Sequence, residues 1–439
     1  MRSFRRSALV ASSTLAACSL VLGACSSSTA TSGTGAAAVD EGSSFTVLIQ
    51  NENPTLSKQL DTLAQGACAD ANKALPLSHE GVAQADVIQK ITLLASQGAL
   101  PNHFVAGTAQ VRPTGDLGKS GALLDYEAKM KELGIWDNIS PAAAATVKGV
   151  YGQMVSLPYQ YNIEGIWYNK KLLSDNGISA PATFDDLVAA MGKLKAAGVT
   201  PITEGGQAGW PLTRLMGMYI FRNVGPTAMA DVQSGKAKLT DPAYVAGAKA
   251  LADLGTKGYF GEGVTSRTAD AATAQFLTGK AAMMYNGSWM LSNINDPKQN
   301  TIGVDTVGFM PFPAVTGGKG TVDQWPANAG TAMAWNAKNF GPKSAAWLTC
   351  IAKNYGKLAA DAGQISGFKS SGTATTTSSA TKTIQTTVGS AKESVLWFEA
   401  LMDSKSNALA STNVALLVSG QMSPADYMSK LQASIDTNK

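Results

Sequence analysis

The sequence predicts an α/β fold divided into two lobes. Short strand-like runs alternate with longer helical segments along the chain, which is the pattern of sheets covered by helices. The 439 residues also exceed what one ordinary hydrophobic core holds, so two lobes are expected. Together these observations predict a sheet flanked by helices in each lobe.

The first elements are predicted from apolar patterning. Phe, Thr, Val, Leu and Ile at 45–49 predict the first strand. Two segments, 56–73 and 85–96, carry apolar residues at three- and four-residue spacing and predict helices. A second strand is expected around 74–78, where the pattern is weak.

Capping residues mark later helices. Thr183 and Asp186 have the spacing of an N-terminal capping box, and the apolar periodicity after them ends at Gly198. The Thr- and Ser-rich segment 370–390 predicts either a surface connection or a strand that crosses between the lobes. Further helix starts are predicted at Asp241-Pro242, Gly341-Pro342 and Ser423-Pro424.

The N-terminus has the pattern of a bacterial lipoprotein signal. Three arginines precede a short apolar run that ends in Leu-Gly-Ala before Cys25, which predicts a signal peptide over 1–24 and lipidation of Cys25. Cys18 follows Leu-Ala-Ala and is the alternative lipidation site. The Ser-, Thr-, Gly- and Ala-rich start of 25–43 favours Cys25, because such a composition predicts a flexible tether.

Charge and hydropathy exclude some classes of partner. The first 24 residues carry three arginines and no acid, so 32 basic and 31 acidic residues remain after their removal. These charges are spread singly, without the basic face that a nucleic-acid-binding protein needs. No other apolar run approaches the length of a membrane span. We therefore expect no nucleic acid partner and membrane contact only through the lipid anchor.

Cysteine and histidine usage argues for a disulfide and against a metal. Cys68 and Cys350 are the two cysteines beyond the leader, and in an oxidising compartment two thiols often pair. The alternative is two buried free thiols. His79 and His103 have no cysteine or carboxylate at metal-ligand spacing beside them, so no metal and no cofactor are expected.

Motifs of catalysis are absent from the sequence. It contains no Gly-x-Ser-x-Gly elbow. The sequence instead has aromatic residues in polar, glycine-containing surroundings. An aromatic face covers the C–H face of a sugar ring while amides and carboxylates bind its hydroxyls, although core packing is the better explanation for any single aromatic taken alone. These aromatic residues are Tyr159, Tyr161, Trp167, Trp210, Trp289, Trp325 and Trp397.

Three blocks carry a family resemblance: Leu-Pro-Tyr at 157–159, Gly-Ile-Trp-Tyr-Asn-Lys at 165–170 and Gly-Lys-Ala-Ala-Met-Met-Tyr-Asn-Gly-Ser-Trp at 279–289. They resemble the extracellular solute-binding protein family that includes maltose-binding protein, the carbohydrate receptors of ABC importers. The resemblance implies a two-lobed periplasmic-binding-protein-like fold with the ligand cleft between lobes joined by crossing strands. The lobes implied are 44–162 with 328–378 and 163–327 with 379–439.

The resemblance also implies the ligand contacts. Trp289 matches the family's sugar-stacking tryptophan, and Trp210 matches another aromatic of the cleft. The crossings are expected near 161–165, 325–332 and 370–388. His103 ends Leu-Pro-Asn-His at 100–103, where relatives commonly have Leu-Pro-Asp-Val, and it is a candidate ligand contact. Its alternative role is a histidine at a strand end whose ring nitrogens are hydrogen-bonded within the protein. The remaining candidate contacts are Tyr161, Asn162 and Glu164 at the first crossing, Trp325 and Asn328 at the second, Asn51 and Glu52 after the first strand, and Trp397.

The function implied is that of a non-enzymatic receptor. It would capture a mono- or oligosaccharide by hinge closure and deliver it to ABC permease subunits, as a lipid-anchored monomer on the extracytoplasmic face of the membrane. One alternative is a surface glycosidase, which needs two carboxylates such as Glu164 and Asp116. The other is a sugar sensor or adhesin on the same fold.

Overall fold

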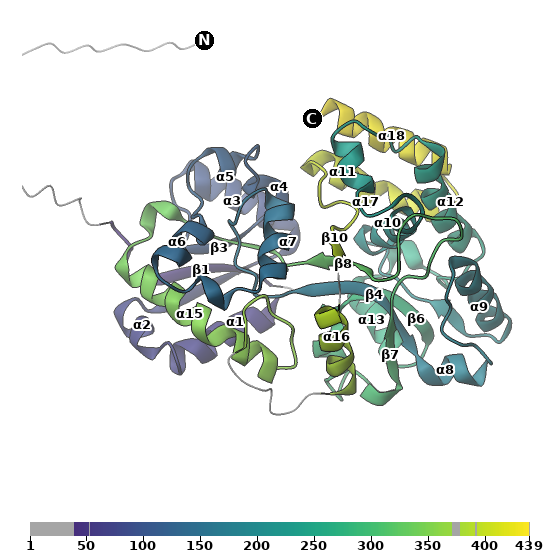
Figure 1. Cartoon of the computed structure of the whole chain (residues 1–439), viewed down its shortest axis with the longest axis horizontal. Coiled ribbons are helices and arrows are strands. Elements are labelled where there is room, and N and C mark those ends of the chain that lie inside the picture. Colours follow the sequence, from purple (N-terminus) through teal and green to yellow (C-terminus); the bar gives the residue numbers. More distant parts are fainter. Residues whose placement is uncertain (1–38, 52, 371–377, 391–392, 439) are drawn as a thin grey trace, which may run out of the picture. The chain divides into compact units, whose positions relative to one another are not determined.

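The computed structural model describes residues 39–51, 53–370, 378–390 and 393–438. Within 39–438 these residues form two β-sheets flanked by helices (Figure 1). The α/β fold with two sheets that the sequence predicts is therefore confirmed. The predicted signal peptide and both candidate lipidation sites, Cys18 and Cys25, lie outside the described residues.

The first sheet contains β1 (Phe45–Gln50), β2 (Leu77–Val82), β3 (His103–Ala106) and β9 (Ala332–Trp335) in the order β2-β1-β3-β9. β1 is parallel to β2 and β3, whereas β9 runs antiparallel to β3. The helices around this sheet are α1 (Pro54–Gln65), α2 (Ala69–Ala74), α3 (Val87–Ser96), α4 (Thr108–Val111), α5 (Asp116–Lys119), α6 (Tyr126–Glu132), α7 (Pro141–Tyr151) and α15 (Pro342–Asp361).

The second sheet contains β4 (Asn162–Asn169), β5 (Thr200–Ile202), β6 (Ala281–Gly287), β7 (Val307–Met310), β8 (Gln324–Asn328) and β10 (Glu393–Val395). Its order is β10-β8-β4-β6-β5, and β7 pairs with β4. The remaining helices are α8 (Lys170–Asp175), α9 (Phe184–Ala196), α10 (Trp210–Val224), α11 (Ala228–Gln233), α12 (Pro242–Thr256), α13 (Ala269–Leu277), α14 (Leu291–Ile294), α16 (Ser379–Ser390), α17 (Ser404–Val418) and α18 (Pro424–Thr437).

Local sequence explains several of these boundaries. The strand predicted at 45–49 is β1, whose apolar residues are buried as expected for a strand inside a parallel sheet. The predicted capping box is present at α9, where the Thr183 hydroxyl accepts from the amide of Asp186 and the Asp186 carboxylate accepts from the amide of Thr183. Each of these groups satisfies an amide that the first helical turn leaves unpaired.

Three sequence predictions need correction. The helix predicted over 56–73 is broken into α1 and α2 at Gly66. The second strand begins at Leu77 instead of near 74, because Leu75 still closes the end of α2. Within the segment 370–388 predicted as the third crossing, residues 379–388 belong to helix α16 beside β7 and do not form a strand (Figure 1); residues 371–377 lie outside the described residues.

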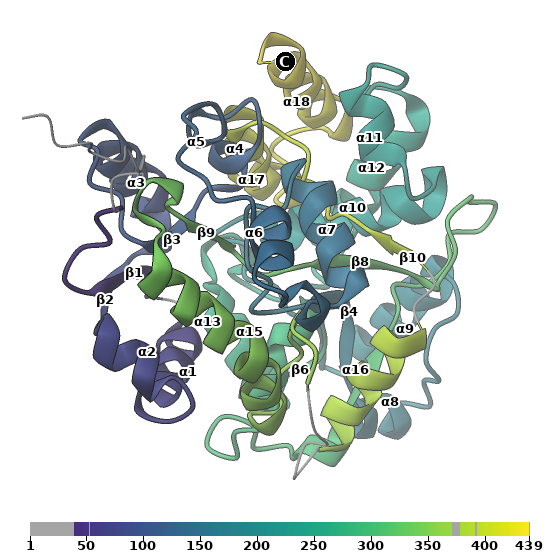
Figure 2. The ribbon, with the colours of Figure 1, turned by 60° about the vertical axis from the view of Figure 1, so that its left-hand side comes forward.

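Three segments connect the two sheets. β4 and β8 run side by side, with Asn162 paired to Asn328, and the chain then enters β9 of the first sheet (Figure 1 and Figure 2). The third connection lies between Phe368, in the core around the first sheet, and Ala380 of α16, in the core beside the second sheet, and so overlaps the range 370–388 that the sequence predicts for it. After β10, Leu396 and Trp397 pack against the core around the first sheet, while Phe398 belongs to the core around the second. Residues 396–398 therefore contact both cores without carrying the chain from one to the other, because β10 and α17 both belong to the part of the chain around the second sheet.

A disulfide ties the N-terminal helices to α15. It joins Cys68, at the start of α2, to Cys350 in α15, with a Cα–Cα distance of 5.7 Å. The two cysteines are separated by 282 residues along the chain. The bond therefore links the beginning of the folded chain to a helix that the chain forms after passing through the second sheet.

The start of α15 is capped by a residue from the beginning of the folded chain. The Glu41 carboxylate accepts hydrogen bonds from the amides of Gly341 (3.2 Å), Lys343 (3.1 Å) and Ser344 (2.6 Å). Burial raises the pKa of Glu41, but these hydrogen bonds outweigh it, so the pKa is lowered from its ordinary value. Glu41 lies inside the predicted tether 25–43, and its side chain satisfies the open amides of a helix.

We expect the Glu41 cap to contribute stability that depends on pH. A carboxylate with a lowered folded pKa stabilises the fold fully above its unfolded pKa of about 4.3, and this stability is lost as the pH falls through the folded pKa. Glu41→Gln should therefore lower the free energy of unfolding by about 0.5–2 kcal/mol at pH 7 and by less at pH 3. Urea denaturation at both pH values measures this. An equal difference at pH 7 and pH 3 would contradict the role of the ionised carboxylate.

None of the helices in the described part of the chain combines the length and apolar character that a membrane span requires. The same residues contain no group of three or more histidine, cysteine, aspartate or glutamate side chains arranged to hold a metal ion.

Candidate functional site

Three tryptophans from distant parts of the chain surround one arginine. Trp210 begins α10, Trp289 follows β6 and Trp397 follows β10. The ring centroids of Trp210 and Trp289 lie 5.9 Å apart in an edge-to-face arrangement. The guanidinium carbon of Arg214 lies 4.9 Å, 5.8 Å and 5.3 Å from the ring centroids of Trp210, Trp289 and Trp397. We call Trp210, Trp289 and Trp397 the tryptophan cluster; all three are half-buried.

Glycines allow these rings to approach the backbone. A Cβ atom at Gly287 would lie 2.0 Å from the Trp289 ring, so the indole lies directly over a residue without a side chain. Gly209 has a φ of +75°, and a Cβ there would lie 2.0 Å from the carbonyl oxygen of Ser411 in α17. Only glycine fits both requirements at position 209. The turn before Trp210 is therefore held against α17.

Arg214 is held by a buried carboxylate on the first crossing strand. Its Nη1 donates to Glu164 Oε1 at 2.6 Å, and Glu164 is 1% exposed. Glu164 also accepts from the Tyr285 hydroxyl (3.2 Å) and from Nδ2 of Asn328 (3.2 Å). Three donors thus satisfy this carboxylate, and they come from α10, β6 and β8. Burial, together with the negative charge of Glu164, raises the pKa of Tyr285 well above its ordinary value, so its hydroxyl stays a donor.

A second carboxylate, Glu399, faces Arg214 from the segment that follows β10. Its Oε2 lies 3.8 Å from Nε of Arg214, and its other oxygen accepts from the hydroxyl of Thr213. Burial raises the pKa of Glu399, while the charge of Arg214 and the Thr213 hydrogen bond act against this rise. Oε2 has no hydrogen-bond partner in the structure. The tryptophan cluster therefore has one cation and two carboxylates at its base.

A pocket of about 430 Å³ opens beside the cluster. It is lined by residues from the elements around the first sheet, which we call the first half, and from the elements around the second sheet, which we call the second half. Helix α17 contributes residues at helical spacing that form one small, polar stripe. This volume lies in the range typical of sites for small organic ligands. The lining residues are Gln84, Ile88, Thr108 and Ala109 from the first half, and Trp397, Glu399, Met402, Ser404, Asn407, Ala408 and Ser411 from the second.

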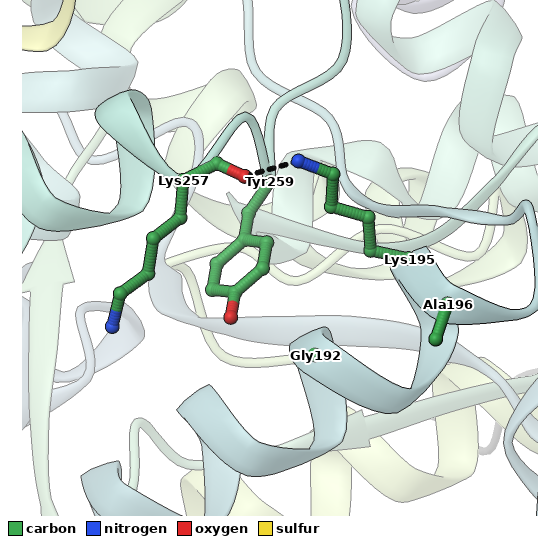
Figure 3. Close-up of a pocket in the computed structure, with 5 residues that line it drawn as sticks. All are labelled: Gly192, Lys195, Ala196, Lys257 and Tyr259. Atoms are coloured by element: carbon green, nitrogen blue, oxygen red, sulfur yellow. Dashed lines mark hydrogen bonds between the residues drawn. The ribbon is translucent and has the colours of Figure 1, made fainter.

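A second pocket, of about 500 Å³, lies on α9 and the turn after α12 (Figure 3). Figure 3 shows the Lys195 ammonium donating to the carbonyl oxygen of Lys257, at 2.6 Å. The pocket is lined by residues of the second half alone and has one aromatic residue, Tyr259. Because Tyr259 is 8% exposed, it offers little ring surface to a ligand. We therefore assign the candidate site to the tryptophan cluster and its adjoining pocket.

The structure brings six of the predicted contacts together. Trp210, Trp289 and Trp397 form the cluster, and Glu164 lies at its base. Glu164 is linked to Asn328, and Asn328 accepts from Nδ2 of Asn162 at 3.2 Å. The hydroxyl of Ser288, next to Trp289, donates to Asn162 Oδ1 at 3.2 Å. These polar residues connect the crossing strands to the residue that precedes the central tryptophan.

His103 is corrected to a core residue of the first half. It is fully buried, its Nδ1 lies 2.8 Å from the carbonyl oxygen of Ala334, and the Tyr159 hydroxyl lies 3.0 Å from its Nε2. Burial lowers the pKa of His103 to about 3, although the bond to Ala334 acts in the other direction. The ring is therefore neutral, and it has no surface to offer a ligand.

Other predicted contacts lie away from the cluster. Trp325 is 8% exposed and stacks on Phe309 in the core, with ring centroids 5.5 Å apart. Tyr161 is 7% exposed in the same core. Asn51 is exposed after β1 and lines neither pocket, and Glu52 lies outside the described residues. For Trp325 and Tyr161, core packing explains the aromatic residue, and the prediction of a ligand contact is corrected.

Sequence reasoning missed Arg214 and Glu399. Arg214 follows Trp210 by four residues on α10, a spacing that places both on one helix face. A helix start at Trp210, with proline as the second helical residue, is the sequence signal that would have revealed this spacing. Glu399 had no local pattern, because its partners Thr213 and Arg214 are about 185 residues earlier and meet it only in the folded chain.

Known proteins resemble this chain in sequence and fold. A probable sugar-binding periplasmic protein of Mesorhizobium japonicum is 28% identical over 232 residues, 52% of this chain and 54% of that protein. The multiple sugar-binding protein of Streptococcus mutans is 28% identical over 38% of this chain and 40% of its own length. This chain thus spans about half or less of the length of these relatives. The solved structure of a chitin oligosaccharide binding protein matches 90% of this chain and 99% of its own, with a TM-score of 0.78 and 27% identity.

Residues 79–354, well over half of the chain, match the family model of bacterial extracellular solute-binding proteins. This confirms the resemblance found in the sequence blocks around Trp167 and Trp289. The members are solute-binding proteins and not enzymes, so the glycosidase built on Glu164 and Asp116 is set aside. The chain belongs to the bacterial extracellular solute-binding protein family.

Proposed function

We propose that this protein captures a mono- or oligosaccharide outside the cytoplasm and delivers it to the permease of an ABC importer. The relatives support a carbohydrate ligand, since those from Mesorhizobium and Streptococcus are named as sugar-binding proteins and a similar structure binds chitin oligosaccharides. An archaeal relative, 24% identical over 46% of this chain, is named as the extracellular binding protein of an ABC transporter.

The single observation that carries the proposal is the tryptophan cluster beside a pocket lined from both halves. Indole faces match the C–H faces of sugar rings, and the nearby hydroxyl, amide and carboxylate groups match sugar hydroxyls as donors and acceptors. Trp289 is the central member, because it contacts Trp210 and lies next to the polar residues of the crossing strands.

Ligand capture is proposed to involve closure of two lobes, 44–162 with 328–378 and 163–327 with 379–439. A ligand favours a closed arrangement only if it binds that arrangement more tightly, which requires contacts from both lobes. The pocket meets this requirement, since Thr108 and Gln84 come from one lobe and Asn407 and Trp397 from the other.

We propose that lipidation of Cys25 holds the receptor on the extracytoplasmic face of the membrane, within reach of the permease. The pattern of basic residues, apolar run and small residues before Cys25 supports this anchor. Mass spectrometry of the membrane-bound protein distinguishes Cys25 from Cys18, because the two cleavage sites leave different N-terminal peptides.

A thermal-shift screen of the form beginning at Ser26 tests the proposed function. The panel contains neutral mono-, di- and oligosaccharides, with amino acids and polyamines as controls. A ligand that binds only the folded state raises the unfolding midpoint increasingly as its concentration exceeds the dissociation constant. We expect one class of saccharide to raise the midpoint in this way. A rise with amino acids or polyamines and none with any saccharide would contradict the proposal.

A further inference from the structure

Arg214 occupies the position that a cationic ligand would take in the tryptophan cluster. Its guanidinium carbon lies within 6 Å of all three ring centroids, which is the separation at which a cation is attracted to an aromatic face. The side chain is 17% exposed, and its Nη1 donates to Oε1 of the buried Glu164 at 2.6 Å. The cluster therefore already contains a cation, and that cation belongs to the protein.

Two buried carboxyl groups face the guanidinium of Arg214. Glu164 is paired with Nη1, and Glu399 faces Nε at a longer distance. The other groups facing Glu399 are Thr213 on the same helix as Arg214, Glu164 on β4 and the buried Tyr427 on α18. Burial raises the pKa of Glu399, while the charge of Arg214 and the Thr213 hydrogen bond act against this rise. The base of the site therefore holds one guanidinium between two buried carboxyl groups.

Removing the arginine would change the chemistry of the site. The three rings would then surround a space flanked by Glu164 and Glu399, and an aromatic cage with nearby carboxylates is the arrangement that recognises ammonium groups. The carboxylates would also repel an anionic ligand. The same rings therefore suit two ligand classes, and the presence of Arg214 decides between them.

We propose that Arg214 is the specificity-determining residue of the site, a built-in cation that fills the tryptophan cluster and restricts the receptor to uncharged saccharides. This inference rests on the proposed function and names the charge class of its substrate. A cationic sugar is repelled by the guanidinium and finds the cage filled, while an anionic sugar meets Glu164 and Glu399. A neutral sugar stacks on the ring surface that remains exposed and bonds through its hydroxyls.

Calorimetric titration with saccharides of matched size and different charge tests this inference. The neutral probes are N,N′-diacetylchitobiose, maltose and cellobiose. The cationic probes are the deacetylated glucosamine disaccharide and choline, and the anionic probe is digalacturonate. For the wild type we expect at least one neutral disaccharide to bind at least about tenfold more tightly than the cationic and anionic probes, a difference of about 1.4 kcal/mol.

The variants remove the built-in cation while keeping the fold measurable. Arg214→Met retains a long side chain but leaves Glu164 buried without its partner, so the double variant Arg214→Met with Glu164→Gln is made beside it. The matched control is Lys131→Met, which removes a cation lying 5.7 Å from the ring centroid of Trp136 in the first half. Circular dichroism verifies that each variant is folded before titration.

We expect both Arg214 variants to lose at least about tenfold in affinity for the neutral disaccharide and the single variant to gain measurable affinity for choline. Lys131→Met should keep the wild-type preference. An Arg214 variant that keeps the wild-type preference for neutral probes would overturn the inference, as would one that binds them more tightly. A wild type that prefers the cationic disaccharide also overturns it while leaving the receptor function intact. A wild type that binds no saccharide in this set or in the thermal-shift panel contradicts the proposed function itself.

Discussion

Replacing Trp289 with alanine is expected to weaken saccharide binding by roughly 1–3 kcal/mol, about five- to 150-fold in the dissociation constant. The indole lies over Gly287, contacts Trp210 edge to face and lies beside Arg214. Its removal therefore deletes a stacking surface and also releases one wall of the tryptophan cluster. Titration calorimetry with the saccharide that gives the largest thermal shift measures the change.

Two further variants separate stacking from general destabilisation. Trp289→Phe keeps an aromatic face and should lose less affinity than the alanine variant. Trp136→Ala removes another half-buried tryptophan, which packs at the edge of the first core away from the cluster. It should leave affinity unchanged. Equal affinities of the wild type and Trp289→Ala would remove Trp289 from the site.

Removing the disulfide should have the largest effect on stability. Replacing both Cys68 and Cys350 with alanine is expected to lower the free energy of unfolding by roughly 2–5 kcal/mol. The bond closes a loop between residues 282 positions apart, and a cross-link between distant residues restricts the unfolded chain. It also links α2 to α15, two elements of the first half, so saccharide affinity at the tryptophan cluster should change little.

Urea denaturation of the oxidised wild type, the reduced wild type and the double alanine variant measures this contribution. The reduced wild type should resemble the variant, and a reductant should leave the variant's stability unchanged. A variant as stable as the oxidised wild type would contradict the account. A variant that loses the expected free energy of unfolding and also binds the saccharide much more weakly would contradict the expectation that the disulfide leaves the tryptophan cluster unaffected.

Much of the fold follows from local patterns. β1 is a continuous apolar run, and α9 begins at a capping box, so both were predictable without knowledge of their neighbours. Helix α16 was missed because Thr and Ser dominate its composition. Its buried Ala380 and Ile384 lie four residues apart and Val388 follows at the same interval, a helical period that would have corrected the predicted strand.

The site was predictable only in part. The three tryptophans were named in advance from their polar surroundings and from the family resemblance, but their meeting point is formed by the ends of β6 and β10 and the start of α10. Glu399 illustrates the limit, since its contacts with α10 come from long-range packing that no spacing in the sequence encodes. His103 and Trp325 show the converse, because residue type alone does not distinguish a core aromatic or histidine from a ligand contact.

The crystal structure of the complex with the most stabilising saccharide of the panel tests the central claim most directly. We predict a sugar ring stacked on Trp289, within about 4 Å of its face, with its hydroxyls bonded to residues of the pocket from both halves. A saccharide bound elsewhere, without contact to Trp210, Trp289 or Trp397, would contradict the assignment of the tryptophan cluster as the binding site.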